Sequence, residues 1–162
     1  MDTKMIRIEI EVNGRIYNQL VRTNETLLDV LRERLGFKGT KQSCENGHCG
    51  SCTVLLDGKP INACLMLAAQ VGQKRITTIE GLCSKDRLHP IQEAFVEAHA
   101  VQCGYCTPGM ILTTKALLDK NGTPGDEEIR EALSGNACRC TGYTKIIDAV
   151  KIAAEKINTK KS

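Results

Sequence analysis

The first half of the chain shows the polar–apolar alternation of β-strands that bury one face. Four short runs have this pattern, and they cover residues 5–12, 15–21, 53–56 and 59–63. Asn13-Gly14 separates the first two runs and Asp57-Gly58 the last two, and both pairs favour tight hairpin turns. Between the hairpins, apolar residues recur at helical spacing over 27–35. This order of elements predicts a small α+β roll.

From about residue 88 the apolar residues follow helical spacing alone. Four amphipathic stripes with short connections cover residues 91–98, 110–118, 129–133 and 146–157. Such a series favours an antiparallel four-helix bundle. A polar stretch over 72–88 separates the two halves. The sequence therefore predicts an α+β protein of two domains, an N-terminal roll over 1–77 and an all-α four-helix bundle over 85–162.

Eight of the nine cysteines fall into two groups with different spacing. The first group has the C-x4-C-x2-C spacing of plant-type 2Fe–2S ferredoxins with a more distant fourth thiol, and it consists of Cys44, Cys49, Cys52 and Cys64. The second group pairs a C-x2-C with a remote C-x-C, and it consists of Cys103, Cys106, Cys138 and Cys140. Four plus four thiolates suit two iron–sulfur clusters, so the chain is predicted to carry electrons.

The loop around the first group suits an anionic cluster. Gly39, Gly47 and Gly50 permit close backbone approach, which lets amide N–H groups point at sulfur. Zinc is the competing occupant, but structural zinc sites favour two C-x2-C knuckles, whereas one loop here supplies three ligands. His48 lies beside Cys49, but Rieske ligation needs two histidines, so we interpret His48 as an ordinary loop residue.

The second group is less specific, because a C-x2-C with a remote pair also fits zinc. Both cysteine pairs come just before a predicted helix, with Thr107-Pro108 as an expected cap of one and Thr141 or Gly142 of the other. The positive ends of both helix dipoles would then face one anionic group.

The net charge of the chain argues against nucleic acid as a partner. The chain carries +3 at neutral pH, and two oxidised clusters of about −2 each would bring the holoprotein to about −1. No basic patch supports nucleic-acid binding. The N-terminus shows no signal peptide and no apolar run approaches the length of a membrane span, so we expect no membrane association and a cytoplasmic location.

The stretches VQCGYCTPGMI (101–111) and GNACRCTGY (135–143), behind ENGHCGSCTV (45–54), resemble the iron–sulfur small subunit of the molybdenum hydroxylases, the xanthine dehydrogenase family. The resemblance implies a plant-type ferredoxin-like (β-grasp) domain that holds one 2Fe–2S cluster on the first cysteine group. It implies a helical domain that holds the other cluster on the second group.

The same resemblance implies partners and a direction. The helical-domain cluster would lie next to the molybdopterin cofactor of a large subunit, with Gln102 and Cys140 against the pterin. The ferredoxin-like cluster would face an FAD-binding subunit. Electrons would then pass from molybdenum through both clusters to FAD, as in xanthine, N-heteroaromatic or aldehyde dehydrogenases.

Three alternatives stay open at this point: the same relay run in reverse, as in a 4-hydroxybenzoyl-CoA reductase, a free ferredoxin-type carrier, and a zinc-binding interaction module. The sequence shows no dinucleotide fingerprint, P-loop or catalytic triad, so we expect no substrate-converting site on this chain. Cys83 belongs to neither group and is interpreted as a small apolar residue, and His89 and His99 as structural residues.

Overall fold

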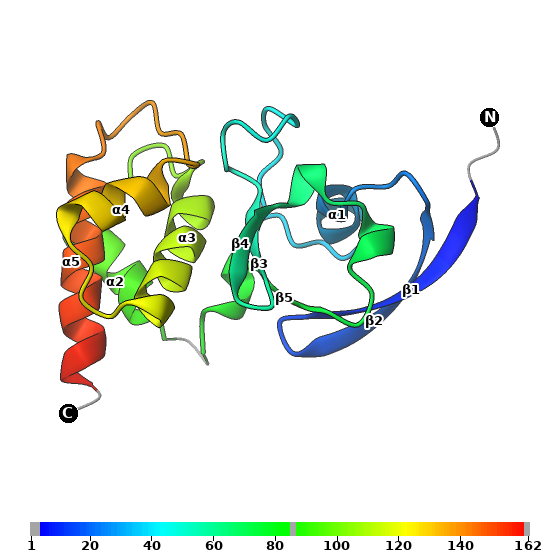
Figure 1. Ribbon diagram of the computed structural model, residues 1–162, viewed down its shortest axis with the longest axis horizontal. Coiled ribbons are helices and arrows are strands. Elements are labelled where there is room, and N and C mark those ends of the chain that lie inside the picture. Colours follow the sequence, from blue (N-terminus) through cyan, green and yellow to red (C-terminus); the bar gives the residue numbers. More distant parts are fainter. Residues whose placement is uncertain (1–3, 85–86, 161–162) are drawn as a thin grey trace.

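The computed structural model describes residues 4–84 and 87–160, so the first residues of the domain predicted over 85–162 lie outside the described part. The two halves of the chain differ in architecture, with a mixed sheet in the first and helices in the second (Figure 1). This confirms the α+β class. Within the described ranges, no helix combines the length and the apolar character needed to cross a membrane.

A five-stranded sheet forms the frame of the first half, in the order β2-β1-β5-β3-β4. The strands are β1 (Met5–Val12), β2 (Arg15–Arg22), β3 (Thr53–Leu56), β4 (Lys59–Asn62) and β5 (Arg75–Thr77). Both predicted hairpins are confirmed, because β1 pairs with β2 and β3 with β4 in antiparallel register. Asn13 and Asp57 have φ of 52° and 49°, and the glycine after each also has a positive φ, as a type I′ turn requires.

One strand was not predicted. The polar stretch over 72–88 was expected to connect the two halves, yet it contains β5, which lies in the middle of the sheet. β5 runs parallel to β1 and antiparallel to β3. With Ile76 as its one buried residue, the strand is too short for alternation to reveal it.

Short helical elements complete the first half. The predicted helix over 27–35 is a turn of α-helix, α1 (Leu27–Asp29), that continues as a π-helical segment, η1 (Val30–Arg34). Its buried leucines and valine pack against the sheet residues in one core. Three 3₁₀ turns, η2 (Ala63–Leu65), η3 (Ala68–Gln70) and η4 (Ile79–Gly81), follow the second hairpin and β5.

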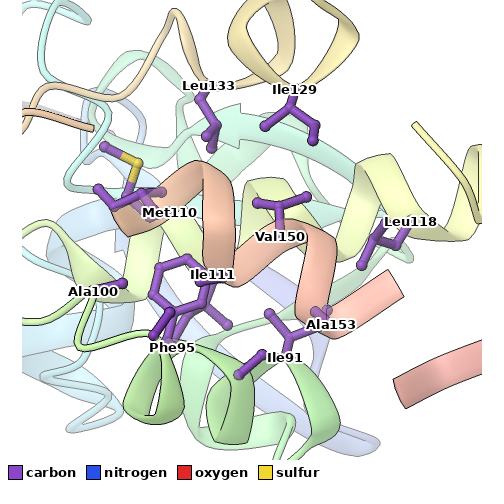
Figure 2. Close-up of a cluster of buried hydrophobic side chains, with 14 of the residues drawn as sticks. Ile91, Phe95, Ala100, Met110, Ile111, Leu118, Ile129, Leu133, Val150 and Ala153 are labelled. Carbon is purple, nitrogen blue, oxygen red and sulfur yellow. The ribbon is translucent and has the colours of Figure 1, made fainter. Parts of the chain in front are cut away.

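The second half contains the four predicted helices, α2 (Pro90–Glu97), α3 (Thr107–Lys120), α4 (Asp126–Leu133) and α5 (Thr144–Thr159). Their apolar stripes meet in a second core, and Figure 2 shows Phe95 of α2 and Ile111 of α3 among its members. The main helix–helix contacts are those of α2 with α5 and α3 and those of α4 with α3 and α5, and α3 also contacts β3 and β4. α3 therefore lies between the sheet and the other helices (Figure 1).

Strand β3 faces both cores. All four of its residues are buried, and consecutive side chains of a strand point to opposite faces. Val54 and Leu56 pack into the core of the first half, whereas Leu55 packs into the helical core. The two halves are thus in contact through an apolar side chain of the sheet, directly after the first cysteine loop.

Candidate iron–sulfur centres

The first cysteine group is assembled by the β3–β4 hairpin. Cys52 comes immediately before β3 and Cys64 lies just after β4. Because Thr53 pairs with Asn62, the start of β3 lies beside the end of β4, and the N–H of Ala63 donates to the carbonyl of Cys52. Two thiols that are twelve positions apart in the sequence therefore meet. Both are buried, whereas Cys44 and Cys49 in the preceding loop are half-buried.

Backbone groups in this loop are directed at sulfur, as the glycine pattern predicted. The N–H of Cys49 lies 3.4 Å from the Cys44 sulfur. Gly47 has a φ of 82°, a backbone conformation that favours glycine, and a Cβ built there would lie 2.5 Å from Cδ1 of the exposed Leu65 side chain. The carbonyl of the same glycine accepts a 3.0 Å bond from the Asn62 amide, which ties the loop to the end of β4.

The thiols of this group differ in acidity. Burial alone would raise the pKa of Cys49, but hydrogen bonds from Ser51 and Cys44 outweigh it and lower that pKa to about 6. Burial raises the pKa of Cys52 to about 12; the backbone N–H of Cys64 opposes this shift and the Cys64 thiol adds to it. Near neutral pH Cys49 is therefore the more readily ionised of these two thiols, whereas Cys52 keeps its proton.

The second group is assembled by the two loops that precede α3 and α5. Sulfur atoms of Cys103 and Cys140 lie 3.6 Å apart, and both residues are exposed. The thiols of Cys106 and Cys138 also interact and are half-buried. Each loop thus contributes one member to an outer pair and one to an inner pair.

Hydrogen-bond donors surround Cys138. Its sulfur accepts bonds from the Thr141 N–H, at 3.4 Å, and from the Thr141 hydroxyl, at 3.2 Å. Burial acts to raise the pKa of this thiol, but the two bonds from Thr141 outweigh it and the pKa is lowered. The N–H of Cys138 donates a 2.8 Å bond to the hydroxyl of Tyr143. Burial raises the pKa of Cys106, the inner partner, to about 12.

The predicted helix caps are wrong in detail. Cys106 is the N-cap residue of α3, and Thr107, expected at that position, is already in the first turn. Tyr143, in the left-handed conformation, is the N-cap residue of α5 in place of Thr141 or Gly142. Thr141 lies before the helix and connects its N-cap residue to the cysteine loop. Its hydroxyl accepts a bond from the Tyr143 N–H and donates one to the Cys138 sulfur.

The donor set fits the group that the spacing implies. The thiols interact in pairs, and a 2Fe–2S cluster takes its four thiolates from the protein as two per iron. N–H and O–H donors aimed at sulfur are the surroundings such a cluster requires.

The structure also shows a contact between the two cysteine loops that the sequence did not indicate. The N–H of Ala137 donates a 2.9 Å bond to the carbonyl of Cys49, and the side-chain amide of Asn136 donates a 3.0 Å bond to the carbonyl of Gly50. Tyr143 and Asn136 are the polar residues that sequence reasoning missed. The GNACRCTGY stretch holds both, but their partners lie elsewhere in the fold.

The remaining predicted residues lie outside the thiol clusters. Gln102 is exposed and adjoins Cys103. Cys83, interpreted as a small apolar residue in the interior or in a loop, is exposed in a loop, and its thiol lies 3.3 Å from the Gln92 side-chain oxygen. His89 has the structural role expected of it, because it is the N-cap residue of α2, where its Nδ1 accepts a 3.2 Å bond from the Ile91 N–H. His48 is exposed.

Comparison with known proteins agrees with this geometry. Residues 10–77 match the family described as a 2Fe–2S iron–sulfur cluster binding domain, and residues 78–151 match a second 2Fe–2S binding domain family. The nicotinate dehydrogenase small FeS subunit of Eubacterium barkeri is 51% identical over 93% of this chain and 96% of its own length.

Solved structures extend the likeness to the whole fold. Quinoline 2-oxidoreductase from Pseudomonas putida 86 matches with a TM-score of 0.93 and 43% identity, over 99% of this chain and 100% of that chain. Aldehyde oxidoreductase from Desulfovibrio gigas matches with a TM-score of 0.92 and 46% identity over 96% of this chain, which corresponds to 18% of that longer polypeptide. The chain therefore belongs to the iron–sulfur small subunits of the molybdenum hydroxylase (xanthine dehydrogenase) family, which carry electrons within multi-subunit oxidoreductases.

Proposed function

We propose that each cysteine group holds one 2Fe–2S cluster, with Cys44, Cys49, Cys52 and Cys64 as ligands of the first and Cys103, Cys106, Cys138 and Cys140 as ligands of the second. The clusters supply reversible one-electron chemistry when bound. The observation that carries this assignment is the pairing of the thiols at adjoining loops, with N–H and O–H donors directed at sulfur.

The difference in exposure between the two groups supports an order of partners. Cys103 and Cys140 are exposed together with Gln102, and Val101 and Tyr105 beside them are 41% and 45% exposed. Apolar and aromatic side chains exposed next to redox ligands suit burial against another subunit. We assign this surface to the large molybdopterin-binding subunit, with Gln102 and Cys140 against the pterin.

The cluster on the first cysteine group would then face an FAD-binding subunit and pass electrons to it, so that electrons travel from molybdenum through this chain to FAD. Relatives named for nicotinate, nicotine and quinoline favour an N-heteroaromatic compound as the substrate of the complex. The substrate would react on the large subunit, and this chain would fix the distance and surroundings of the two redox groups.

The finer domain description is part of the same proposal. We propose that residues 1–77 and 85–162 are separate domains and that α2 to α5 form a four-helix bundle. The two apolar cores support this division, because their buried members come from one proposed domain each, apart from Leu55 of the sheet and Leu82 of the connecting segment, which both belong to the helical core. The nine free thiols favour a reducing, cytoplasmic location.

Single cysteine variants test the cluster assignment. Cys49→Ser should alter one EPR-distinguishable reduced centre and spare the other, and Cys106→Ser should do the reverse. Cys83→Ser is the matched control, and it should keep the iron content and both signals of the unaltered protein. Loss of both signals in either ligand variant would contradict two separate clusters, and zinc without iron and acid-labile sulfide would refute the iron–sulfur assignment.

Co-purification tests the partners. A tagged copy of the chain, expressed from its native locus, should bring down one polypeptide that carries molybdopterin and another that carries FAD. Recovery of a stable monomer with both clusters but no such polypeptides would instead support a free ferredoxin-type carrier.

A further inference from the structure

We infer that Asn136 is a positioning residue that holds the two cysteine loops against each other and thereby sets the electronic coupling between the two clusters. The inference rests on the proposed function, since it requires both cysteine groups to carry clusters. It assigns a role to a side chain that binds no metal in that proposal.

Asn136 is a buried amide whose hydrogen bonds join three parts of the fold. Its Nδ2 donates to the carbonyl of Gly50 at 3.0 Å and to the hydroxyl of Thr53 at 3.3 Å. Its Oδ1 accepts a 2.8 Å bond from the hydroxyl of Thr113 on α3. The residue is 5% exposed. One side chain of the second cysteine loop is therefore bonded to the first cysteine loop, to β3 and to α3.

Around this amide, the backbone at Gly50 lies very close to the backbone at Gly109 and at Gly135. A Cβ at Gly109 would lie 2.4 Å from the carbonyl oxygen of Gly50, and a Cβ at Gly50 would lie 2.3 Å from the carbonyl oxygen of Gly135. Glycine at these positions removes the side chains that would keep the loops apart. The Asn136 amide then fixes the orientation of loops that the glycines allow to touch.

The contact matters because ligand cysteines lie on both sides of it. Ala137, which follows Asn136 and precedes Cys138, donates its N–H to the carbonyl of Cys49 at 2.9 Å. The Cys49 and Cys138 sulfurs are thus connected by backbone and a single hydrogen bond. An electron that passes between the clusters leaves one reduced centre and enters one oxidised centre, with no bond made and no proton moved. Its tunnelling rate falls steeply with distance, so a small separation of these loops should slow it.

Position 136 needs a polar side chain because buried polar groups surround it. The carbonyl of Gly50 and the hydroxyl of Thr113 are enclosed by the two halves of the protein, and a buried polar group without a partner is costly. An apolar side chain of similar size would fill the space but leave the Thr113 hydroxyl without its acceptor. The Gly50 carbonyl would keep the N–H and hydroxyl of Thr53 as donors but lose the Asn136 amide. An aspartate would fill it as well, but it would place a carboxylate against a carbonyl oxygen.

The test compares Asn136→Asp with Asn158→Asp in the purified complex. The control makes the same chemical change to a bond of the same kind, because the Asn158 Nδ2 also donates to a glycine carbonyl, that of Gly122, at 3.0 Å. Iron and acid-labile sulfide are measured first, together with the EPR g values of each reduced cluster. The readouts are the low-temperature spin–spin splitting between the two reduced clusters and the rate at which an electron equilibrates between them.

We expect Asn136→Asp to keep both clusters and their individual g values, to lose or change the splitting, and to transfer electrons several-fold more slowly. Asn158→Asp should match the unaltered complex in both readouts. If Asn136→Asp fails to accumulate, Thr113→Val, which removes the hydroxyl that orients the amide, should shift both readouts in the same direction.

The inference is overturned if the splitting and the rate are unchanged in the altered complex, or if the unaltered complex shows no splitting. Absence of iron and sulfide from the unaltered protein is a different result, because it would refute the proposed function itself.

Discussion

The N–H of Ala137 donates a 2.9 Å hydrogen bond to the carbonyl of Cys49, across 88 positions of sequence, as the residue numbers show. This bond joins the two cysteine loops at the point where the helical half meets the sheet. It gives the four thiols of each group a fixed position relative to the other four.

Gly109→Ala should push the start of α3 away from the first cysteine loop and from the Asn136 amide. The added methyl group would lie 2.4 Å from the Gly50 carbonyl oxygen, which is backbone and cannot move aside cheaply. We expect a loss of about 1–3 kcal/mol in the free energy of unfolding, as for other overpacked interiors. Faster hydrogen exchange at the Ala137 amide should accompany it. Gly135→Ala is the control, because a Cβ there meets nothing within 4 Å and should leave both measurements unchanged.

Thr141→Val should lower the reduction potential of one cluster. The hydroxyl donates to the Cys138 sulfur at 3.2 Å, and such a bond strengthens as the cluster gains negative charge. A difference of about 1 kcal/mol between the two redox states corresponds to roughly 40 mV. Redox titration followed by EPR measures this shift. Thr141→Ser keeps the hydroxyl and should restore the potential, and an equal shift in both variants would contradict the explanation.

Tyr143→Phe should loosen the second cysteine loop. The hydroxyl accepts the Cys138 N–H at 2.8 Å and lies 3.3 Å from the Asn136 carbonyl oxygen. Its removal leaves a half-buried N–H without its partner, at a cost of about 1–3 kcal/mol. We expect a chelator to bleach the second cluster faster while the first is unaffected. Tyr17→Phe, in the sheet half, is the control. Tyr17 packs edge-on against Phe37 and belongs to neither cysteine loop, so this variant should leave both bleaching rates unchanged.

His89 should make stability depend on pH. Burial lowers its pKa in the folded protein, and the positive charge of Lys115 adds to this, while Asp119 opposes it. The neutral ring caps α2 through Nδ1, which cannot accept a bond once protonated. Because the unfolded state binds the proton more readily, this contribution is fully present above about pH 6.5 and is lost as pH falls through the lower folded pKa.

Thermal unfolding of the unaltered protein and of His89→Asn, measured above and below about pH 6.5, checks this dependence. Asparagine caps a helix without titrating, so the variant should lose less stability on acidification, with a difference of about 1 kcal/mol or less. Cluster lability at low pH affects both proteins equally and cancels in the comparison. Parallel losses in the two proteins would show that His89 is not the group responsible.

Local sequence patterns were sufficient for much of the fold. The hairpins at Asn13-Gly14 and Asp57-Gly58 were predicted correctly because a two-residue turn is specified by the residues that form it. The four helices of the second half were predicted because amphipathic spacing is repeated within each of them. The helix caps were not, because Cys106 and Tyr143 occupy positions for which neither residue type has a strong intrinsic preference.

The chemistry could be inferred from the sequence alone, because the first cysteine group has the plant-type ferredoxin spacing and the stretches around the second group resemble those of a known iron–sulfur family. Only the tertiary structure decided how the groups are arranged. The pairing of Cys52 with Cys64 follows from the register of β3 and β4, and β5 is a strand because β1 and β3 lie on either side of it. Asn136 has no distinguishing local pattern, because its partners are 86, 83 and 23 positions away. Long-range contacts of this kind depend on how the elements pack, and no short stretch of sequence encodes them.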